Sequence, residues 1–155
     1  MGPLANPRRL EAMDAFVADA NAKWARVLAG GGRLGNRAYC FPLTLADVRE
    51  NARAMHEEPF GPLALVNPVR NLDEAIERAN ALPYGLAAYA FTRSATNADR
   101  LAEGIEAGNI SINHVVASIA ETPFGGFKES GFGREGGVEE LECYTIIKSI
   151  SHLTP

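Results

Sequence analysis

The chain has 155 residues and a formal net charge of −4, with 46% hydrophobic and 22% charged residues. This length and composition are typical of a soluble globular protein that buries a core of its own. Because the sequence has no cluster of Lys and Arg and no long apolar stretch, we expect neither nucleic acid nor a membrane as its partner.

Cysteine and histidine are too few and too dispersed for a disulfide framework or a metal site. Cys40 and Cys143 are far apart and form no Cys-x-x-Cys motif, which is typical of a protein from a reducing cytoplasm. His56, His114 and His152 lack the spacing of metal ligands. We therefore expect a cytoplasmic protein without a structural metal.

In the first half of the chain, the spacing of apolar residues predicts a long helix and then shorter elements. Three glycines at 30–32 mark the end of the helix. The expected elements are a helix over 7–29, a kinked or edge strand over 39–45, a short helix over 47–55 and a strand over 63–69.

In the second half, strands alternate with helices of crossover length. Asn71 is expected to cap a helix, with Glu74 in the capping-box position three residues later. The alternation predicts an α/β fold and a single domain over 1–155. The elements that follow this helix are expected to be a buried strand over 86–91, a helix over 95–107, a strand over 109–113, a short helical piece over 138–141 and a last strand over 143–151.

The last strand, 143–151, is rich in β-branched residues and includes Ile146, Ile147 and Ile150. An apolar strand at this place needs a sheet edge to join. Two interpretations stay open, because the edge is either within this chain or on another subunit.

One motif with functional meaning is Glu57-Glu58-Pro59-Phe60-Gly61-Pro62. The Gly-Pro pair predicts a rigid turn that holds a carboxylate and an aromatic ring in defined positions. Without its flanking residues, the acidic pair has a simpler interpretation as a solvated helix end.

A second motif is the glycine-rich run over 123–137, which also contains three phenylalanines. Aromatic residues among glycines predict a packed irregular loop and not a flexible linker. The run includes Gly131-Phe132-Gly133-Arg134-Glu135-Gly136, which matches the pattern G-x-G-x-x-G. We reject it as a dinucleotide fingerprint, because no buried strand precedes it and no long helix follows.

In this order, the two motifs resemble the C-terminal signatures of the NAD(P)-dependent aldehyde dehydrogenase family. The resemblance covers nearly the whole chain. It implies the C-terminal part of the catalytic domain, an open and mostly parallel sheet with flanking helices. It also implies that residues 143–151 form an oligomerisation strand through which a homo-oligomer assembles.

The resemblance implies a cofactor role for two residues of the first motif. Glu58 would accept hydrogen bonds from the hydroxyls of the nicotinamide ribose, and Phe60 would contact the nicotinamide side of NAD or NADP. A carboxylate suits this position because it accepts from two vicinal hydroxyls at once.

For the substrate side, the resemblance places Asn113 near the pocket in a structural role and Phe124 close to the aldehyde. The loop over 114–122 would line the aldehyde entrance. Its Ser118 resembles the serine that contacts the distal carboxylate in the succinate-semialdehyde dehydrogenase branch, a task that suits a hydroxyl donor. The other interpretation of Ser118 is a solvated loop serine.

The implied reaction is the oxidation of an aldehyde, such as succinate semialdehyde, to the acid through a cysteine nucleophile. In the family that cysteine and the cofactor domain precede the segment seen here, and Cys40 and Cys143 are expected to be inert thiols. No catalytic residue is therefore assigned, and the chain alone is expected to be inactive and to bind no cofactor tightly. The alternative is a non-catalytic assembly module that docks its last strand onto a related subunit.

Overall fold

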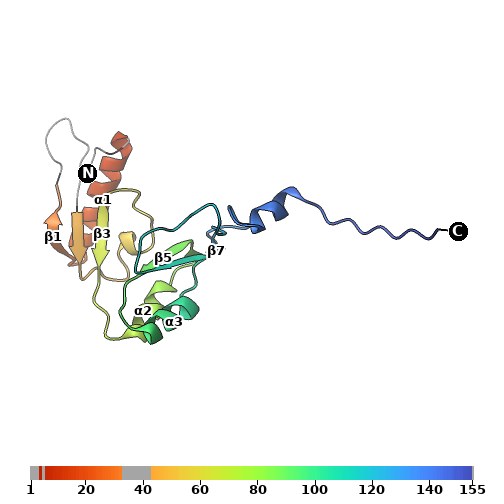
Figure 1. Ribbon diagram of the computed structural model, residues 1–155. Coiled ribbons are helices and arrows are strands. Elements are labelled where there is room, and N and C mark those ends of the chain that lie inside the picture. The colour runs from red at the N-terminus through yellow and green to blue at the C-terminus, as the bar shows by residue number, and fades with distance from the viewer. Residues whose placement is uncertain (1–3, 5, 33–42, 155) are drawn as a thin grey trace. The chain divides into compact units, whose positions relative to one another are not determined.

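The computed structural model describes residues 4, 6–32 and 43–154 (Figure 1). The chain divides into two compact units, Met1–Val69 and Arg70–Pro155. Both units combine helices with strands, which confirms the predicted α/β class. Cys40 and most of the strand expected over 39–45 lie outside the described residues.

The first unit is built from a long helix, a short 3₁₀ helix and a three-stranded sheet. The central strand β2 pairs antiparallel with β1 and parallel with β3. The elements are α1 (Pro7–Ala22), β1 (Arg26–Gly30), β2 (Leu43–Ala46), η1 (Arg53–Met55) and β3 (Leu63–Val66).

The core of the first unit lies between α1 and β2. Met13, Phe16 and Ala20 recur at helical spacing and bury one face of α1. They pack with Leu45 of β2 and Val48 beyond it. Met13 and Leu45 are fully buried, and full burial of such a side chain contributes about 1.5–3 kcal/mol. This packing fixes α1 as the support for the loops that follow β2.

The predicted helix over 7–29 is wrong in its last third. Trp24 adopts a left-handed conformation with φ of 66°. Its N–H donates to the carbonyl of Asn21 at 3.1 Å, and the N–H of Ala25 donates to Ala20 at 3.0 Å. These bonds form a left-handed C-cap, which usually has glycine at the position that tryptophan takes here. The apolar residues after Trp24 belong to β1.

The two segments after β2 are shorter than predicted. Of the helix expected over 47–55, only η1 is helical. The strand expected over 63–69 is confirmed as β3, which ends at Val66.

The second unit contains two helices and two small sheets. β5 and β6 pair in parallel, and β4 and β7 pair antiparallel. Figure 1 shows α2 and α3 next to each other. The elements are α2 (Leu72–Ala79), β4 (Tyr84–Gly85), β5 (Ala87–Ala90), α3 (Ala95–Gly104), β6 (Asn109–Ile112), β7 (Phe127–Lys128) and η2 (Glu139–Tyr144).

The predicted N-cap of α2 is confirmed, because Asn71 Oδ1 accepts a hydrogen bond from the N–H of Glu74 at 2.9 Å. The reciprocal bond of a capping box does not form, because the Glu74 carboxylate accepts from the N–H of Arg70 instead. Helix α3 ends at Gly104, earlier than expected. The strand predicted over 86–91 forms as β5, but its burial was predicted wrongly. Tyr89 is 49% exposed and Phe91 68% exposed in this unit.

The end of the second unit is extended. The first residues of 143–151 lie in η2, and residues 145–154 join no strand of the described chain. Figure 1 shows this stretch as a single extended segment. The most exposed apolar side chains here are Ile146 (96%), Ile147 (100%) and Leu153 (91%). An oligomerisation role for this segment stays a prediction.

Candidate functional site

The two adjacent carboxylates of the first motif differ in their contacts. Glu57 forms a bidentate ion pair with Arg53, in which Nε lies 2.9 Å from Oε1 and Nη2 lies 2.7 Å from Oε2. Hydrogen bonding to the Arg53 guanidinium lowers the pKa of Glu57 below its ordinary value. Glu57 is therefore already partnered within the protein.

Arg53 is in turn fixed against α1. Its guanidinium carbon lies 5.2 Å from the centre of the Phe16 ring, within the range of a cation–π contact. Its backbone N–H donates to Asp19 Oδ2 at 2.8 Å. Lys23 donates to the other oxygen of Asp19 at 2.7 Å, and this bond is the main cause of the lowered pKa of Asp19. Side chains of α1 thus hold both the backbone and the guanidinium of Arg53.

Glu58 has a different environment. Its side chain is exposed, and it forms no hydrogen bond or ion pair with any residue that the structure describes. Both of its oxygens are available to a ligand, and an ionised carboxylate accepts hydrogen bonds only. Glu58 therefore suits a ligand that presents neighbouring hydroxyl groups.

Phe60 projects from the same loop. It is 67% exposed and adopts a φ of 43°, a left-handed conformation that is strained for a bulky residue. The next residue lies close to α1, since a Cβ added to Gly61 would lie 2.7 Å from Met13 Sδ. The loop thus presents an aromatic ring to solvent from a backbone packed on the core.

Asn113 joins the ends of β5 and β6. It has a φ of 63°. Its N–H donates to the carbonyl of Ala90 at 2.7 Å, and its Oδ1 accepts from the N–H of Thr92 at 2.8 Å. All these contacts are with backbone, as expected for a residue that shapes the loop.

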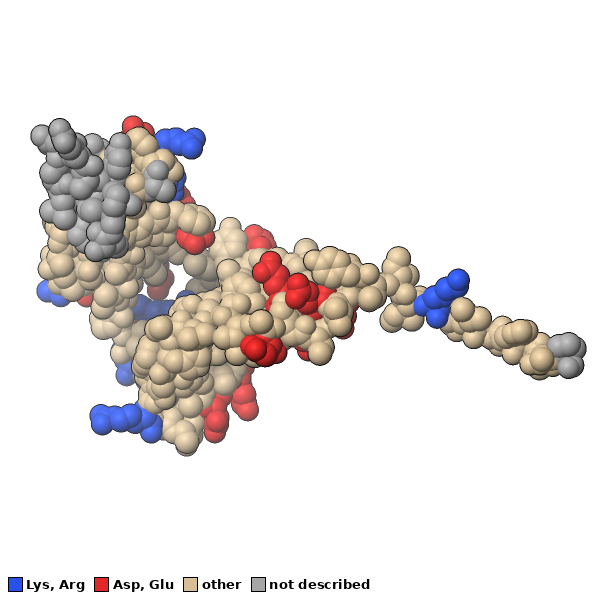
Figure 2. All heavy atoms as spheres, turned by 45° about the horizontal axis from the view of Figure 1, so that its top comes forward, with Lys and Arg blue, Asp and Glu red and all other residues tan. Residues whose placement is uncertain are grey.

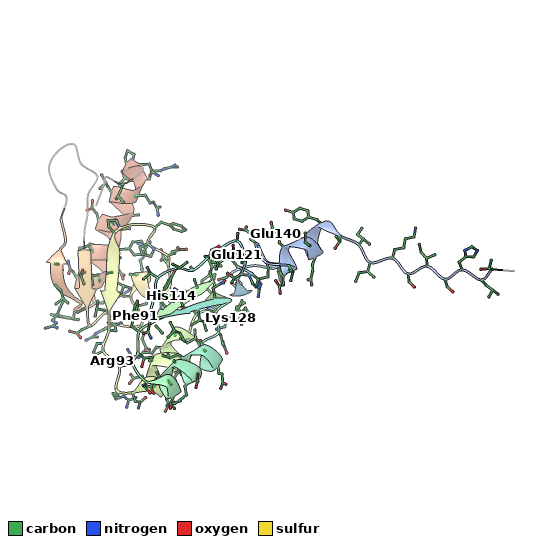
Figure 3. The ribbon with its side chains drawn as sticks, viewed as in Figure 1. Phe91, Arg93, His114, Glu121, Lys128 and Glu140 are labelled. Atoms are coloured by element: carbon green, nitrogen blue, oxygen red, sulfur yellow. The ribbon has the colours of Figure 1, made fainter. Side chains whose placement is uncertain are left out.

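The loop over 114–122 is anchored by a hydrogen bond from β6. Ser111, only 4% exposed, donates from Oγ to the carbonyl of Val116 at 2.6 Å. Ser118 is exposed and has no partner among the described residues. Figure 3 labels His114 and Glu121 at the two ends of this loop. Its anchoring leaves the Ser118 hydroxyl available to a ligand.

Phe124 is half-buried, and its backbone is held on two sides. On one side it exchanges hydrogen bonds with Glu135, of 2.7 Å and 2.8 Å. On the other side, Asn109 Nδ2 donates to the carbonyl of Pro123 at 3.0 Å, and Asn109 Oδ1 accepts from the N–H of Gly125 at 3.1 Å. Asn109 was not among the predicted site residues, because an asparagine that binds distant backbone has no local sequence pattern.

The backbone also approaches itself closely in this region. A Cβ added to Gly108 would lie 1.7 Å from the carbonyl oxygen of Gly125. Only glycine permits this approach. Lys128 anchors the loop as well, donating to the carbonyl of Asn80 at 2.9 Å and pairing with Glu106 at 2.6 Å.

No other chemistry emerges from the residues described. Cys143 is exposed and lies 3.0 Å from the carbonyl of Glu140. No three side chains of His, Cys, Asp and Glu in these ranges are arranged to hold a metal. No helix here is both long and apolar enough for a membrane span. Figure 2 shows acidic side chains near the start of the extended segment, where η2 carries Glu139, Glu140 and Glu142.

The site residues therefore fall into two groups. Glu58 and Phe60 lie in the first unit, and Asn113, Ser118 and Phe124 lie in the second. Within each group, the residues come from loops anchored on helices or strands.

The sequence model of the aldehyde dehydrogenase family matches residues 1–150. The chain belongs to the aldehyde dehydrogenase family. This confirms the resemblance carried by the two motifs.

Relatives within the aldehyde dehydrogenase family support this membership. The chain is 40% identical over 153 residues to 4-(hydroxymethyl)benzenesulfonate dehydrogenase TsaD1 of Comamonas testosteroni, covering 99% of this chain and 32% of the relative. It is 46% identical over 136 residues to succinate-semialdehyde dehydrogenase [NADP(+)] of Deinococcus radiodurans, covering 87% and 28%. The chain thus spans about a third of the length of these relatives.

Solved structures agree. The NAD+ complex of the aldehyde dehydrogenase from Bacillus cereus is 37% identical, with a TM-score of 0.90 over 97% of this chain and 31% of that chain. The succinate-semialdehyde dehydrogenase from Burkholderia pseudomallei is also 37% identical, with a TM-score of 0.88 over 96% and 31%. These matches confirm a partial aldehyde dehydrogenase catalytic domain.

Proposed function

We propose that residues 1–155 belong to an enzyme that oxidises an aldehyde to the carboxylic acid with NAD or NADP. In this proposal, the segment supplies a contact to the cofactor ribose and part of the aldehyde pocket. The observation that supports it most strongly is the carboxylate of Glu58, which has no partner in the part of the chain that the structure describes, beside Glu57, which Arg53 already binds. Membership of the aldehyde dehydrogenase family supports it independently.

Two residues of the first unit fit a nicotinamide cofactor. Glu58 accepts hydrogen bonds from the vicinal hydroxyls of the nicotinamide ribose, and the exposed ring of Phe60 contacts the nicotinamide side. When bound, the cofactor supplies the hydride acceptor that the side chains of a protein lack. The role of Glu58 and Phe60 is to bind and orient it.

The substrate is an aldehyde with an anionic group remote from the reacting carbon, such as succinate semialdehyde. The names of two relatives support this, since one name includes succinate semialdehyde and the other a benzenesulfonate, and both of these compounds carry an anionic group. Ser118 donates its hydroxyl to the remote anion, and Phe124 packs near the aldehyde. Asn113 keeps the loop between them in shape.

The nucleophilic cysteine comes from outside residues 1–155. The 155-residue chain by itself is therefore inactive and binds no cofactor tightly. The active assembly is a homo-oligomer in the cytoplasm, where Cys40 and Cys143 stay reduced.

Aldehyde-dependent formation of NADH or NADPH tests this function. The complete protein that contains these residues is expected to reduce the cofactor with succinate semialdehyde, and the 155-residue chain is expected not to do so. Turnover by the 155-residue chain alone would overturn the assignment of the nucleophile. Absence of turnover by the complete protein with a panel of aldehydes would overturn the proposed reaction.

One observation favours a second function, a non-catalytic assembly module. Residues 145–154 expose their isoleucines and join no strand within the described chain, and such a segment suits addition to the edge of a foreign sheet. Light scattering on the chain with and without residues 145–155 tests the association. Association that requires this segment, together with a complete protein that binds no cofactor, would favour the assembly module.

A further inference from the structure

The side chain of Asn109 makes the hydrogen bonds to the backbone around Phe124 that a neighbouring strand would make. Its amide donates to the carbonyl before Phe124, on Pro123, and accepts from the N–H after it, on Gly125, at 3.0 Å and 3.1 Å. A neighbouring strand would satisfy the same backbone groups in the same alternating way. One side chain thus holds the backbone on both sides of Phe124.

The opposite side of Phe124 is held as well. Its own N–H and carbonyl pair with Glu135 at 2.7 Å and 2.8 Å. Asn109 and Glu135 therefore bind alternate backbone groups of residues 123–125. Neither contact uses the ring, so the ring position depends on a backbone that both residues fix.

We propose that Asn109 is a positioning residue that sets the affinity of the enzyme for its aldehyde by fixing Phe124. The inference rests on the proposed function, in which Phe124 lines the aldehyde pocket. Asn109 touches neither substrate nor cofactor in this account and acts through the backbone of residues 123–125. Loss of its amide contacts lets Phe124 shift and weakens aldehyde binding, while cofactor binding is unchanged.

The second unit contains a matched control. Asn80 Nδ2 donates to the carbonyl of Gly104 at 2.7 Å, and its Oδ1 accepts from the N–H of Glu106 at 2.8 Å. It brackets Ile105 with the same chemistry with which Asn109 brackets Phe124. The segment held by Asn80 carries no proposed substrate residue. It meets the glycine-rich loop through Lys128, which binds the backbone carbonyl of Asn80 and the side chain of Glu106, and Asn80→Leu removes neither of these groups. Asn80→Leu therefore reports the cost of losing such a bracket away from Phe124.

The experiment compares Asn109→Leu and Asn80→Leu in the complete, aldehyde-oxidising protein. Leucine is close to asparagine in size and removes both hydrogen bonds. We expect both variants to unfold at a lower temperature, because each leaves backbone groups unpaired. Asn109→Leu is expected to raise the aldehyde KM about tenfold, since small displacements in a pocket have large effects on the reaction. Asn80→Leu is expected to leave the KM for aldehyde and for cofactor unchanged.

A double-mutant cycle with Phe124→Leu tests separately whether Phe124 lines the aldehyde pocket and whether Asn109 acts through Phe124. If Asn109 acts through Phe124, Asn109→Leu adds little to the aldehyde KM of Phe124→Leu. An unchanged KM in Asn109→Leu, when Phe124→Leu raises it, would overturn the role of Asn109. An unchanged KM in Phe124→Leu would overturn the pocket assignment itself, and with it this inference.

A second variant and a second measurement cover the case in which Asn109→Leu does not fold. Asn109→Asp keeps the acceptor for the N–H of Gly125 and loses the donor to Pro123. We expect it to raise the aldehyde KM less than the leucine variant does. Amide hydrogen exchange at Gly125 is expected to stay slow in Asn109→Asp and in Asn80→Leu. Fast exchange at Gly125 in Asn80→Leu would contradict the proposal. An unchanged aldehyde KM in a folded Asn109→Asp would also contradict it, if Phe124→Leu raises the aldehyde KM.

Discussion

Arg53 binds Glu57 through two hydrogen bonds, of 2.9 Å and 2.7 Å, and leaves Glu58 without a partner among the described residues. Surface ion pairs of this kind contribute little to stability on average. Their effect on local charge is larger, because Arg53 neutralises one of two adjacent carboxylates. A dinucleotide cofactor carries negatively charged phosphates, so a second negative charge beside Glu58 is expected to weaken its binding.

Replacement of Arg53 tests this division of roles. Arg53→Gln is expected to weaken NAD(P)+ binding a few-fold, because the freed Glu57 adds a negative charge next to Glu58. The double variant Arg53→Gln/Glu57→Gln is expected to restore the affinity. Titration of the complete protein with NAD(P)+ at low ionic strength measures both, since salt screens exposed charges. Equal affinities of the single and double variants would contradict the account.

Replacement of Ser118 tests the substrate proposal. Ser118→Ala is expected to raise the KM for succinate semialdehyde about tenfold, because a hydrogen bond to a charged group is lost. The KM for butanal, which has no remote carboxylate, is expected to stay the same. Steady-state kinetics with both aldehydes measure the ratio. An equal change for the two substrates would assign Ser118 to the shape of the loop.

Replacement of Gly108 tests the close approach between its backbone and that of Gly125 in the glycine-rich loop. Gly108→Ala would place a Cβ 1.7 Å from the carbonyl oxygen of Gly125, whereas an added Cβ at Gly32 has no atom within 4 Å. We expect Gly108→Ala to lower the free energy of unfolding by about 1–3 kcal/mol or more. Gly32→Ala is the matched control and is expected to be neutral or slightly stabilising. Urea unfolding of both variants measures the difference, and a neutral Gly108→Ala would refute the packing.

Glu74 links stability to pH. The carboxylate of Glu74 accepts hydrogen bonds from the backbone N–H and from the side chain of Arg70. These bonds, the backbone one first, lower the pKa of Glu74 below the ordinary 4.5. A carboxyl whose pKa is lower in the folded state adds stability above its unfolded pKa. That contribution disappears as the pH falls through the folded value. The gain over Glu74→Gln is therefore expected to be complete near neutral pH and absent in strong acid.

Urea unfolding of the wild-type and Glu74→Gln proteins at a series of pH values measures this gain. Glu77→Gln is the control on the same helix, since Glu77 accepts no hydrogen bond within the described residues. A difference between wild type and Glu74→Gln that stays constant from neutral pH to strong acid would contradict the linkage.

Local patterns predicted the elements that depend on local chemistry. The N-cap of α2 is an example, because Asn71 lies three residues before Glu74 and accepts a hydrogen bond from its N–H. The helix α1 was predicted too long for an equally local reason. Apolar residues continue past its end, and Trp24 takes a backbone conformation that its sequence does not announce.

The candidate site depends more on contacts between distant residues. The motifs singled out Glu58 and Phe124, but the pairing that distinguishes Glu57 from Glu58 requires the position of Arg53 on the ring of Phe16. The bracket formed by Asn109 reaches 14 residues along the chain. No periodicity or spacing predicts such a contact, so only the folded arrangement shows it.

The most direct test of the central claim is the affinity of the complete protein for NAD(P)+ in the variants Glu58→Gln and Glu57→Gln. The account predicts that Glu58→Gln weakens binding about tenfold or more, because an ionised acceptor for the ribose hydroxyls is lost. It predicts that Glu57→Gln does not weaken binding, since this change removes a negative charge and leaves the Arg53 guanidinium without its partner carboxylate. Unchanged affinity in Glu58→Gln, or an equal loss in both variants, would contradict the assignment of Glu58 as the ribose ligand.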